Sequence, residues 1–236
     1  MHHNLQTYDH GKMIWDAMEA LNDLVDLSDP DLDLPNIQHL FQSAEAMRLD
    51  GRPDWMQVTA LLHDLGKIMY LWGDNSIGTG MEKQYAIVGD TFVVGCALPA
   101  TLVFPEFNEL NPDMQDPRYN TDLGMYEEGC GLDNLTLTWG HDEYMYRVLQ
   151  NMGAACKLPK EALWMVRYHS FYSWHTHDAY KQFLAPEDAA KLEAVRDFNK
   201  YDLYSKDGSN TYTISDMKTR YLPLLHKYLG KGPIFF

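Results

Sequence analysis

The spacing of apolar residues along the chain predicts a mostly helical protein. Hydrophobic side chains recur at intervals of three and four positions, a period that gathers them on one face of an α-helix. Several of these stretches follow a proline, as at Pro35, Pro53 and Pro159, where helices commonly begin. We therefore expect an all-α fold. The predicted helices are residues 12–26, 36–49, 54–72, 141–152, 159–172, 186–204 and 215–229.

One long stretch lacks helical periodicity. Residues 73–135 are rich in Gly, Pro and Asn and contain only short apolar runs, which predicts ordered loops with a short helix near 101–110. Loop regions of this length are uncommon in compact domains and often carry function. No linker or repeat interrupts the sequence. We expect residues 1–236 to form one helical domain with a loop-rich insertion at about 73–135.

Composition and charge narrow the class of protein. The 236 residues include 34 acidic and 19 basic side chains, which gives a formal net charge of −15. Nucleic acid and anionic membranes bind concentrated positive charge, so neither is an expected partner. The three cysteines are widely spaced, as is usual in reducing compartments. We expect a cytoplasmic, soluble monomer without a transmembrane segment.

The strongest chemical signal is His63-Asp64 in the predicted helix 54–72. On a continuous helix, His63, Asp64 and Lys67 would form a polar arc beside the apolar stripe. Burial of such charges is costly without a partner, and an adjacent imidazole and carboxylate can bind one or two metal ions. An isolated His-Asp pair is usually a surface feature, but the apolar run before it and Gly66-Lys67 after it favour a buried site.

Four more polar side chains lie on other predicted helices, and two of them, His141 and His169, are on faces expected to point inward. They are His39, His141, His169 and Asp202. Each alone is more often a core or surface residue than a ligand. Together with His63-Asp64 they form a set of imidazoles and carboxylates of the kind that helical bundles place in their cores. Because the set has no thiolate, it favours iron or manganese over a structural zinc ion.

The set suggests two ions that share Asp64. One ion would also take His39, His63 and Asp202. The other would take His141 and His169 and keep open positions, the pattern by which non-haem Fe(II) binds substrate and O2. Lys67 would project toward these positions, where an ammonium can donate to a developing oxyanion.

The remaining histidines are not expected to bind metal. His2, His3 and His10 lie in a polar stretch, and His226 has no acidic neighbour. The run His175-Thr176-His177-Asp178 looks like a metal motif, but we place it in a loop after a predicted helix.

Several longer strings resemble known families. Leu62-His63-Asp64-Leu65-Gly66-Lys67 is typical of the HD-domain superfamily, and other strings closely resemble the myo-inositol oxygenase family from about residue 20 to the last predicted helix. These strings are residues 88–92, 94–96, 111–113, 115–119, 139–146, 169–172 and 197–204. The Trp-Gly-His-Asp-Glu-Tyr block is the most specific, because ordinary HD hydrolases lack it.

The resemblance implies an HD-domain helical bundle with a mixed-valent Fe(II)/Fe(III) centre. Such a centre would use O2 to cleave myo-inositol between C1 and C6, giving D-glucuronate. The implied iron ligands are His39, His63, Asp64, His141, His169 and Asp202, with Asp64 bridging; Asp64 and Lys67 would be catalytic. The implied inositol contacts are Asp26, Ser28, Lys67, Gly89, Asp90, His169, Ser170 and Lys206. Carboxylate acceptors and lysine donors suit a ligand that offers only hydroxyls.

Three features depart from the family pattern. Leu27 stands where the family often has an acidic residue, and segment 74–84 is longer than usual, which predicts an altered lid. A substrate-contacting Arg on an amino-terminal arm is expected to be missing.

Two other functions fit parts of the sequence. An HD-type metal-dependent phosphohydrolase would need more basic residues near the site and no O2, and a non-catalytic polyol-binding scaffold would not need an intact ligand set.

Overall fold

The computed structural model describes residues 10–27, 34–85, 87–204 and 211–236. In this part of the chain the protein is mainly helical, which confirms the all-α prediction. The α-helices are α1 (Ile14–Ala20), α2 (Asn36–Leu49), α3 (Asp54–Leu62), α4 (His141–Asn151), α5 (Lys160–Tyr168), α6 (Tyr172–His175), α7 (Asp188–Tyr204) and α8 (Ile214–Leu229). Two short strands, β1 (Gly11–Lys12) and β2 (Ile234–Phe235), pair in an antiparallel sheet.

The predicted helix bounds hold for some helices and fail for others. Helices α2, α4, α7 and α8 agree with the prediction to within two residues. The predicted helix 12–26 ends early, at Ala20. The predicted helix 159–172 is interrupted after Tyr168 and resumes as α6. The interruption includes His169, one of the candidate ligands.

The prediction of one continuous helix over 54–72 was wrong. Helix α3 ends at Leu62, and the chain continues after Asp64 as a 3₁₀-helix, η2 (Leu65–Trp72). Asp64 has φ −94° and ψ −2°, outside the usual α-helical values. Its carbonyl accepts the Lys67 N–H at 3.0 Å, the three-residue spacing that defines a 3₁₀ turn. The helix therefore changes type at the His63-Asp64 pair.

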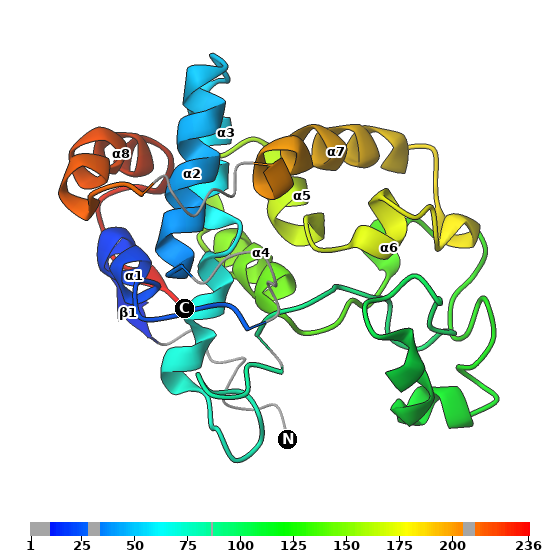
Figure 1. Ribbon diagram of the computed structural model, residues 1–236. Helices are drawn as coiled ribbons and strands as arrows, with labels where there is room; N and C mark the ends of the chain where they lie inside the picture. Colours follow the sequence, from blue (N-terminus) through cyan, green and yellow to red (C-terminus); the bar gives the residue numbers. More distant parts are fainter. Residues whose placement is uncertain (1–9, 28–33, 86, 205–210) are drawn as a thin grey trace.

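The helices pack in two groups around α2 and α3. These two helices lie side by side at the centre, with α1 and α8 on one side and α4, α5 and α7 on the other (Figure 1). Fully buried side chains such as Phe41, Leu61 and Val166 fill the space between them. Each such side chain contributes about 1.5–3 kcal/mol to the stability of the fold. The polar site is embedded in this apolar packing.

The insertion consists of loops, as predicted, and of short 3₁₀-helices, of which only the one near 101–110 was predicted. Three of them are η3 (Pro105–Leu110), η4 (Pro112–Gln115) and η5 (Leu132–Asn134); η3 lies within the short helix predicted near 101–110. Two more 3₁₀ turns follow later in the chain, η6 (Gly153–Ala155) and η7 (Lys181–Phe183). The segment with η3 and η4 lies away from α2 and α3 (Figure 1).

A second cluster of buried apolar residues anchors the insertion. Val93 and Leu132 from the insertion pack in one cluster with Phe171 and Trp174 near α6. No helix in the described residues is long and apolar enough to cross a membrane. The assignment of the whole chain to one domain stays a prediction.

Candidate metal centre

Four buried imidazoles converge from separate helices. His39 lies in α2 and His63 directly follows α3, whereas His141 is the first residue of α4 and His169 directly follows α5. The Nε2 atoms of His39 and His63 are 3.1 Å apart, and those of His141 and His169 are 3.2 Å apart. The centre thus contains two imidazole pairs.

Backbone carbonyls fix the orientation of three of these rings. Nδ1 of His63 donates to the Ala60 carbonyl at 2.7 Å, and Nδ1 of His169 donates to the Val166 carbonyl at 3.0 Å. Nδ1 of His141 donates to the carbonyl of Ile87 at 2.7 Å. Because a carbonyl can only accept, each Nδ1 carries a proton and each Nε2 can offer its lone pair to the centre. Metal-binding histidines are commonly held in this way.

Asp64 lies between the two imidazole pairs. Its Oδ2 is 3.7 Å from His63 Nε2 and 3.8 Å from His39 Nε2. Its Oδ1 is 3.3 Å from His141 Nε2 and 3.4 Å from His169 Nε2. Each carboxylate oxygen therefore faces a different pair, as a bridging carboxylate requires.

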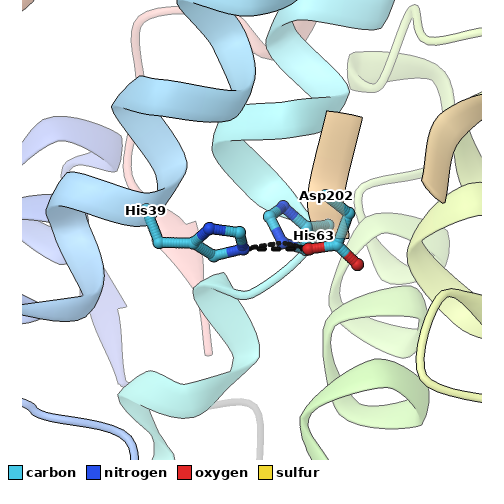
Figure 2. Close-up of side chains that lie close together, drawn as sticks. All are labelled: His39, His63 and Asp202. Atoms are coloured by element: carbon cyan, nitrogen blue, oxygen red, sulfur yellow. Dashed lines mark hydrogen bonds and ion pairs between the residues drawn. The ribbon is translucent and has the colours of Figure 1, made fainter. Parts of the chain in front are cut away.

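Asp202 belongs to the His39–His63 pair. Helix α7 brings its Oδ1 to 2.9 Å from His39 Nε2 and 3.3 Å from His63 Nε2, and Figure 2 shows the three side chains meeting from three helices. Its other oxygen, Oδ2, is buried without a hydrogen-bond partner in the described residues. A buried carboxylate oxygen of this kind is costly unless a cation binds it.

The donor set fits metal ions. Nε2 of His141 and of His169 can both carry lone pairs, and two lone pairs 3.2 Å apart repel unless a cation or a proton lies between them. Neighbouring ligand atoms around a metal ion with bonds of about 2.1 Å lie about 3 Å apart. Groups of potential ligand atoms lie within 4.8 Å of one another, among them His39, His63 and Asp202. Nitrogen and oxygen donors without thiolate suit iron.

The electrostatics of the site also favour cations. Burial raises the pKa of the Asp64 carboxyl, but Lys67 and His63 outweigh it and hold this pKa well below its usual range. Burial likewise raises the pKa of Asp202, and His63 and His39 lower it well below its usual range. Burial lowers the pKa of His141, but Asp142 and Asp64 raise it to about 10. The site thus holds carboxylates in their charged form and retains a proton where a metal ion can replace it.

Lys67 is held between two carboxylates beside the centre. Its Nζ donates to Asp64 Oδ2 at 2.7 Å and to Asp26 Oδ2 at 2.6 Å. Burial lowers the pKa of Lys67, but the charges of Asp64 and Asp26 raise it above its ordinary value. The ammonium is therefore a hydrogen-bond donor and does not act as a base. Lys67 and Asp26, two of the predicted inositol contacts, lie together.

The other predicted inositol contacts among the described residues lie near the His141–His169 pair or in the adjoining loop. Ser170 Oγ is 3.2 Å from His141 Nε2. Gly89 has φ +95° and open space around it, so glycine is needed there and its backbone is accessible. Asp90 accepts the Val103 N–H at 3.0 Å. Burial raises the pKa of the Asp90 carboxyl above its ordinary value.

Close backbone packing brings η2 against the start of α4. A Cβ atom at Gly66 would clash with the backbone carbonyl of His141, so a larger residue would push the two segments apart. Nearby, the Glu143 carboxylate accepts from Arg167 Nε at 2.7 Å. This buried ion pair ties α4 to α5.

Two predicted site residues lie outside the described residues, and one motif needs correction. Ser28 and Lys206 are the predicted contacts in the undescribed ranges. The prediction that His175 lies in a loop was wrong: it is the last residue of α6 and is buried. Its Nε2 donates to the His169 carbonyl at 2.9 Å. Burial lowers the pKa of His175 to about 4, so it supports the ligand segment as a neutral ring.

Sequence reasoning missed two polar residues at the centre. Asn36 Nδ2 donates to Asp64 Oδ2 at 3.0 Å, so α2 contributes a second polar contact besides His39. Asp142 is buried, and its Oδ1 is 2.6 Å from His141 Nε2. The sequence feature that could have identified Asp142 as a site residue is its place directly after His141 in the Trp-Gly-His-Asp-Glu-Tyr block.

Comparisons with known proteins show the family of this chain. The sequence profile of the family "Myo-inositol oxygenase" matches residues 1–235. The inositol oxygenase of Dictyostelium discoideum is 42% identical in a match that covers 96% of this chain and 81% of that protein. The inositol oxygenase of Rattus norvegicus is 46% identical, covering 94% of this chain and 75% of that protein. Inositol oxygenase 1 of Arabidopsis thaliana is 45% identical, covering 91% of this chain and 67% of that protein. The chain therefore belongs to the myo-inositol oxygenase family.

Proposed function

We propose that this protein is an inositol oxygenase that uses O2 to cleave the ring of myo-inositol between C1 and C6, giving D-glucuronate. Its membership of the family over nearly the whole chain supports this activity. The observation that carries the proposal is the position of Asp64, whose two oxygens face two separate imidazole pairs. Such an arrangement suits a two-metal centre better than a single ion.

We infer that the cofactor is a pair of iron ions in the mixed-valent Fe(II)/Fe(III) state. Asp64 would bind both ions. His39, His63 and Asp202 would hold one, and His141 and His169 the other. When bound, iron supplies the O2 activation and redox chemistry that no side chain provides. The nitrogen and oxygen donors and the lowered pKa values of Asp64 and Asp202 support this assignment.

The inositol would bind beside the His141–His169 pair, which has fewer protein ligands. Asp26 and Asp90 can accept from its hydroxyls, and Ser170 can accept or donate. The open backbone at Gly89 gives a polyol close access to the loop. Ser28 and Lys206, which lie outside the described residues, complete the proposed contacts. Multiple hydroxyl contacts of this kind fix the ring orientation before any bond breaks.

Lys67 would stabilise negative charge on a substrate oxygen. Its ammonium is fixed by Asp64 and Asp26, so it needs no rearrangement during the reaction, and preorganised donors are the most effective. Because its pKa is raised, Lys67 keeps its proton throughout and acts as a donor. The buried setting also excludes water, which would weaken this interaction.

The remaining features fit an enzyme for a neutral substrate. The net charge of −15 gives no reason to expect nucleic acid or an anionic membrane as partner. We infer a monomer in the cytoplasm, consistent with the free cysteines.

O2 consumption with myo-inositol tests the proposal directly. We expect iron-loaded protein to consume O2 only when myo-inositol is present and to release D-glucuronate, identified by mass spectrometry. Other cyclitols provide the comparison. A phosphohydrolase would instead release phosphate from phosphorylated substrates without O2, and a polyol-binding scaffold would bind inositol without turnover; either result would refute the proposal.

A further inference from the structure

Asp142 joins three segments that surround the proposed inositol site. It lies in the first turn of α4, where a carboxylate is favoured by the helix dipole. Its Oδ2 accepts from the Ser170 N–H and from the Thr91 hydroxyl, both at 3.1 Å. Its Oδ1 is 3.2 Å from Ser170 Oγ and 2.6 Å from His141 Nε2. One carboxylate thus connects α4, the loop after Gly89 and the segment after α5.

A backbone hydrogen bond reinforces this connection. The Thr91 N–H donates to the Ser170 carbonyl at 3.0 Å, so the loop and the Ser170 segment are linked at both backbone and side chain. Thr91, Asp142 and Ser170 are all buried, which makes these hydrogen bonds costly to lose.

The carboxylate also influences whether the Ser170 hydroxyl donates or accepts a hydrogen bond. Asp142 can only accept, so when the Ser170 hydroxyl donates to it, the lone pairs of Ser170 Oγ remain available to a substrate hydroxyl. A serine held in this way favours a ligand that donates at that point, which distinguishes one hydroxyl orientation from another.

We propose that Asp142 is a positioning residue that holds Ser170 and the Gly89–Thr91 loop for recognition of the cyclitol. This inference rests on the proposed function. Asp142 Oδ1 lies close to the potential ligand atoms of His141 and His169, whereas its Oδ2 is held by two buried donors. We assign the carboxylate a positioning role through these donors, and metal analysis of the variant below distinguishes this role from metal binding.

The variant Asp142→Asn tests this role with little change in shape. An amide NH₂ group in place of Oδ2 cannot accept from the Ser170 N–H or the Thr91 hydroxyl, so these hydrogen bonds would be lost. We expect iron content equal to that of the unaltered protein, a KM for myo-inositol raised about tenfold or more, and a smaller change in kcat. We also expect weaker discrimination between myo-inositol and its stereoisomers. Initial rates with several cyclitols and metal analysis measure these quantities.

Two further variants separate positioning from folding. Glu143→Gln alters the adjacent buried carboxylate, which faces Arg167; we expect lower thermal stability with unchanged KM and selectivity. Thr91→Val keeps Asp142 and removes one hydroxyl that donates to it, so we expect a KM raised about threefold. If Asp142→Asn does not fold, this variant tests the positioning role in its place.

Loss of about one iron per chain in Asp142→Asn would show that Asp142 is a metal ligand instead. KM and selectivity within twofold of the unaltered protein would also overturn the inference. Absence of turnover in the unaltered protein would refute the proposed function, and this inference with it.

Discussion

The centre has two ends, one at the His39–His63 pair and one at the His141–His169 pair, and they differ in the groups that surround them. The His39–His63 end is completed by Asp202 and covered by Phe198, whose ring centroid is 5.3 Å from that of His63. The His141–His169 end has a hydroxyl within reach, Ser170 Oγ at 3.2 Å from His141 Nε2. At the first end, the proposed ligand Asp202 has an oxygen without a hydrogen-bond partner in the described residues. The second end also has a carboxylate, Asp142, but its Oδ2 is held by Thr91 and Ser170, and a serine hydroxyl lies beside it. A polyol therefore suits the His141–His169 end.

The largest expected effect comes from removing the residue that the two ends share. In Asp64→Ala, both imidazole pairs lose their common carboxylate, so we expect loss of both metal ions and a fall in turnover of roughly 10³-fold or more. Metal analysis together with O2 consumption measures the change. Retention of both ions would contradict the bridging role.

Asp202→Ala is the matched control for that variant. It removes a buried carboxylate from the His39–His63 end alone, so we expect about one iron per chain to remain, held at the His141–His169 end. Equal metal loss in Asp64→Ala and Asp202→Ala would mean that the two ends do not bind independently.

The two ends also differ in how well the sequence predicted them. His39 and Asp202 lie in α2 and α7, whose bounds were predicted to within two residues, so helical periodicity placed them correctly. His63 and Lys67 were assigned to one continuous helix, but the chain changes to a 3₁₀-helix at Asp64. The apolar spacing of residues 54–72 does not reveal such a change. The 3₁₀ segment packs closely against a residue remote in the sequence, at Gly66 and His141.

The His141–His169 end depends on contacts that are remote in the sequence. Asp142 follows His141 directly, and on an isolated helix the two side chains point about 100° apart. Both reach the centre because Thr91 and Ser170 surround the start of α4. Nothing in the local pattern of residues 73–135 places that loop, which is why sequence reasoning found the histidines and missed the carboxylate beside them.

Lys67→Ala tests the chemistry next to the bridge without removing a proposed ligand. We expect metal content to be retained and kcat/KM for myo-inositol to fall about 10²-fold, because a preorganised donor to substrate oxygen is lost. Lys191 offers a control, since it is equally buried between Asp188 and Asp133 but lies outside the centre. Lys191→Ala should lower the melting temperature and leave kcat/KM unchanged. Similar kinetics for the two variants would remove Lys67 from the site.

The smallest effect on activity is expected at Glu45, which lies on the same helix as His39 but faces α8. Its carboxylate accepts from Tyr221 Oη at 2.6 Å and from Arg48 Nη2 at 2.8 Å. Burial raises the pKa of Glu45, but Arg48, Tyr221 and Arg220 lower it to about 2. Because this pKa is lower in the folded protein than in the unfolded chain, the charged carboxylate stabilises the fold above pH 4.5. That contribution is lost as the pH falls toward 2.

Glu45→Gln should therefore separate the stability of the bundle from the function of the centre. At pH 7 we expect the free energy of unfolding to fall by about 1–3 kcal/mol, with metal content and turnover unchanged. Urea unfolding should show a smaller difference between variant and unaltered protein at pH 3. At that pH the unfolded chain binds a proton at Glu45, so the charged carboxylate in the folded protein contributes less to stability. Carboxylates of the centre also titrate at low pH. Because both proteins contain them, their contributions cancel in the difference between the two free energies of unfolding. A difference that stays constant or grows between pH 7 and pH 3 would contradict the role assigned to Glu45, and altered turnover would show that the α2–α8 contact influences the position of His39.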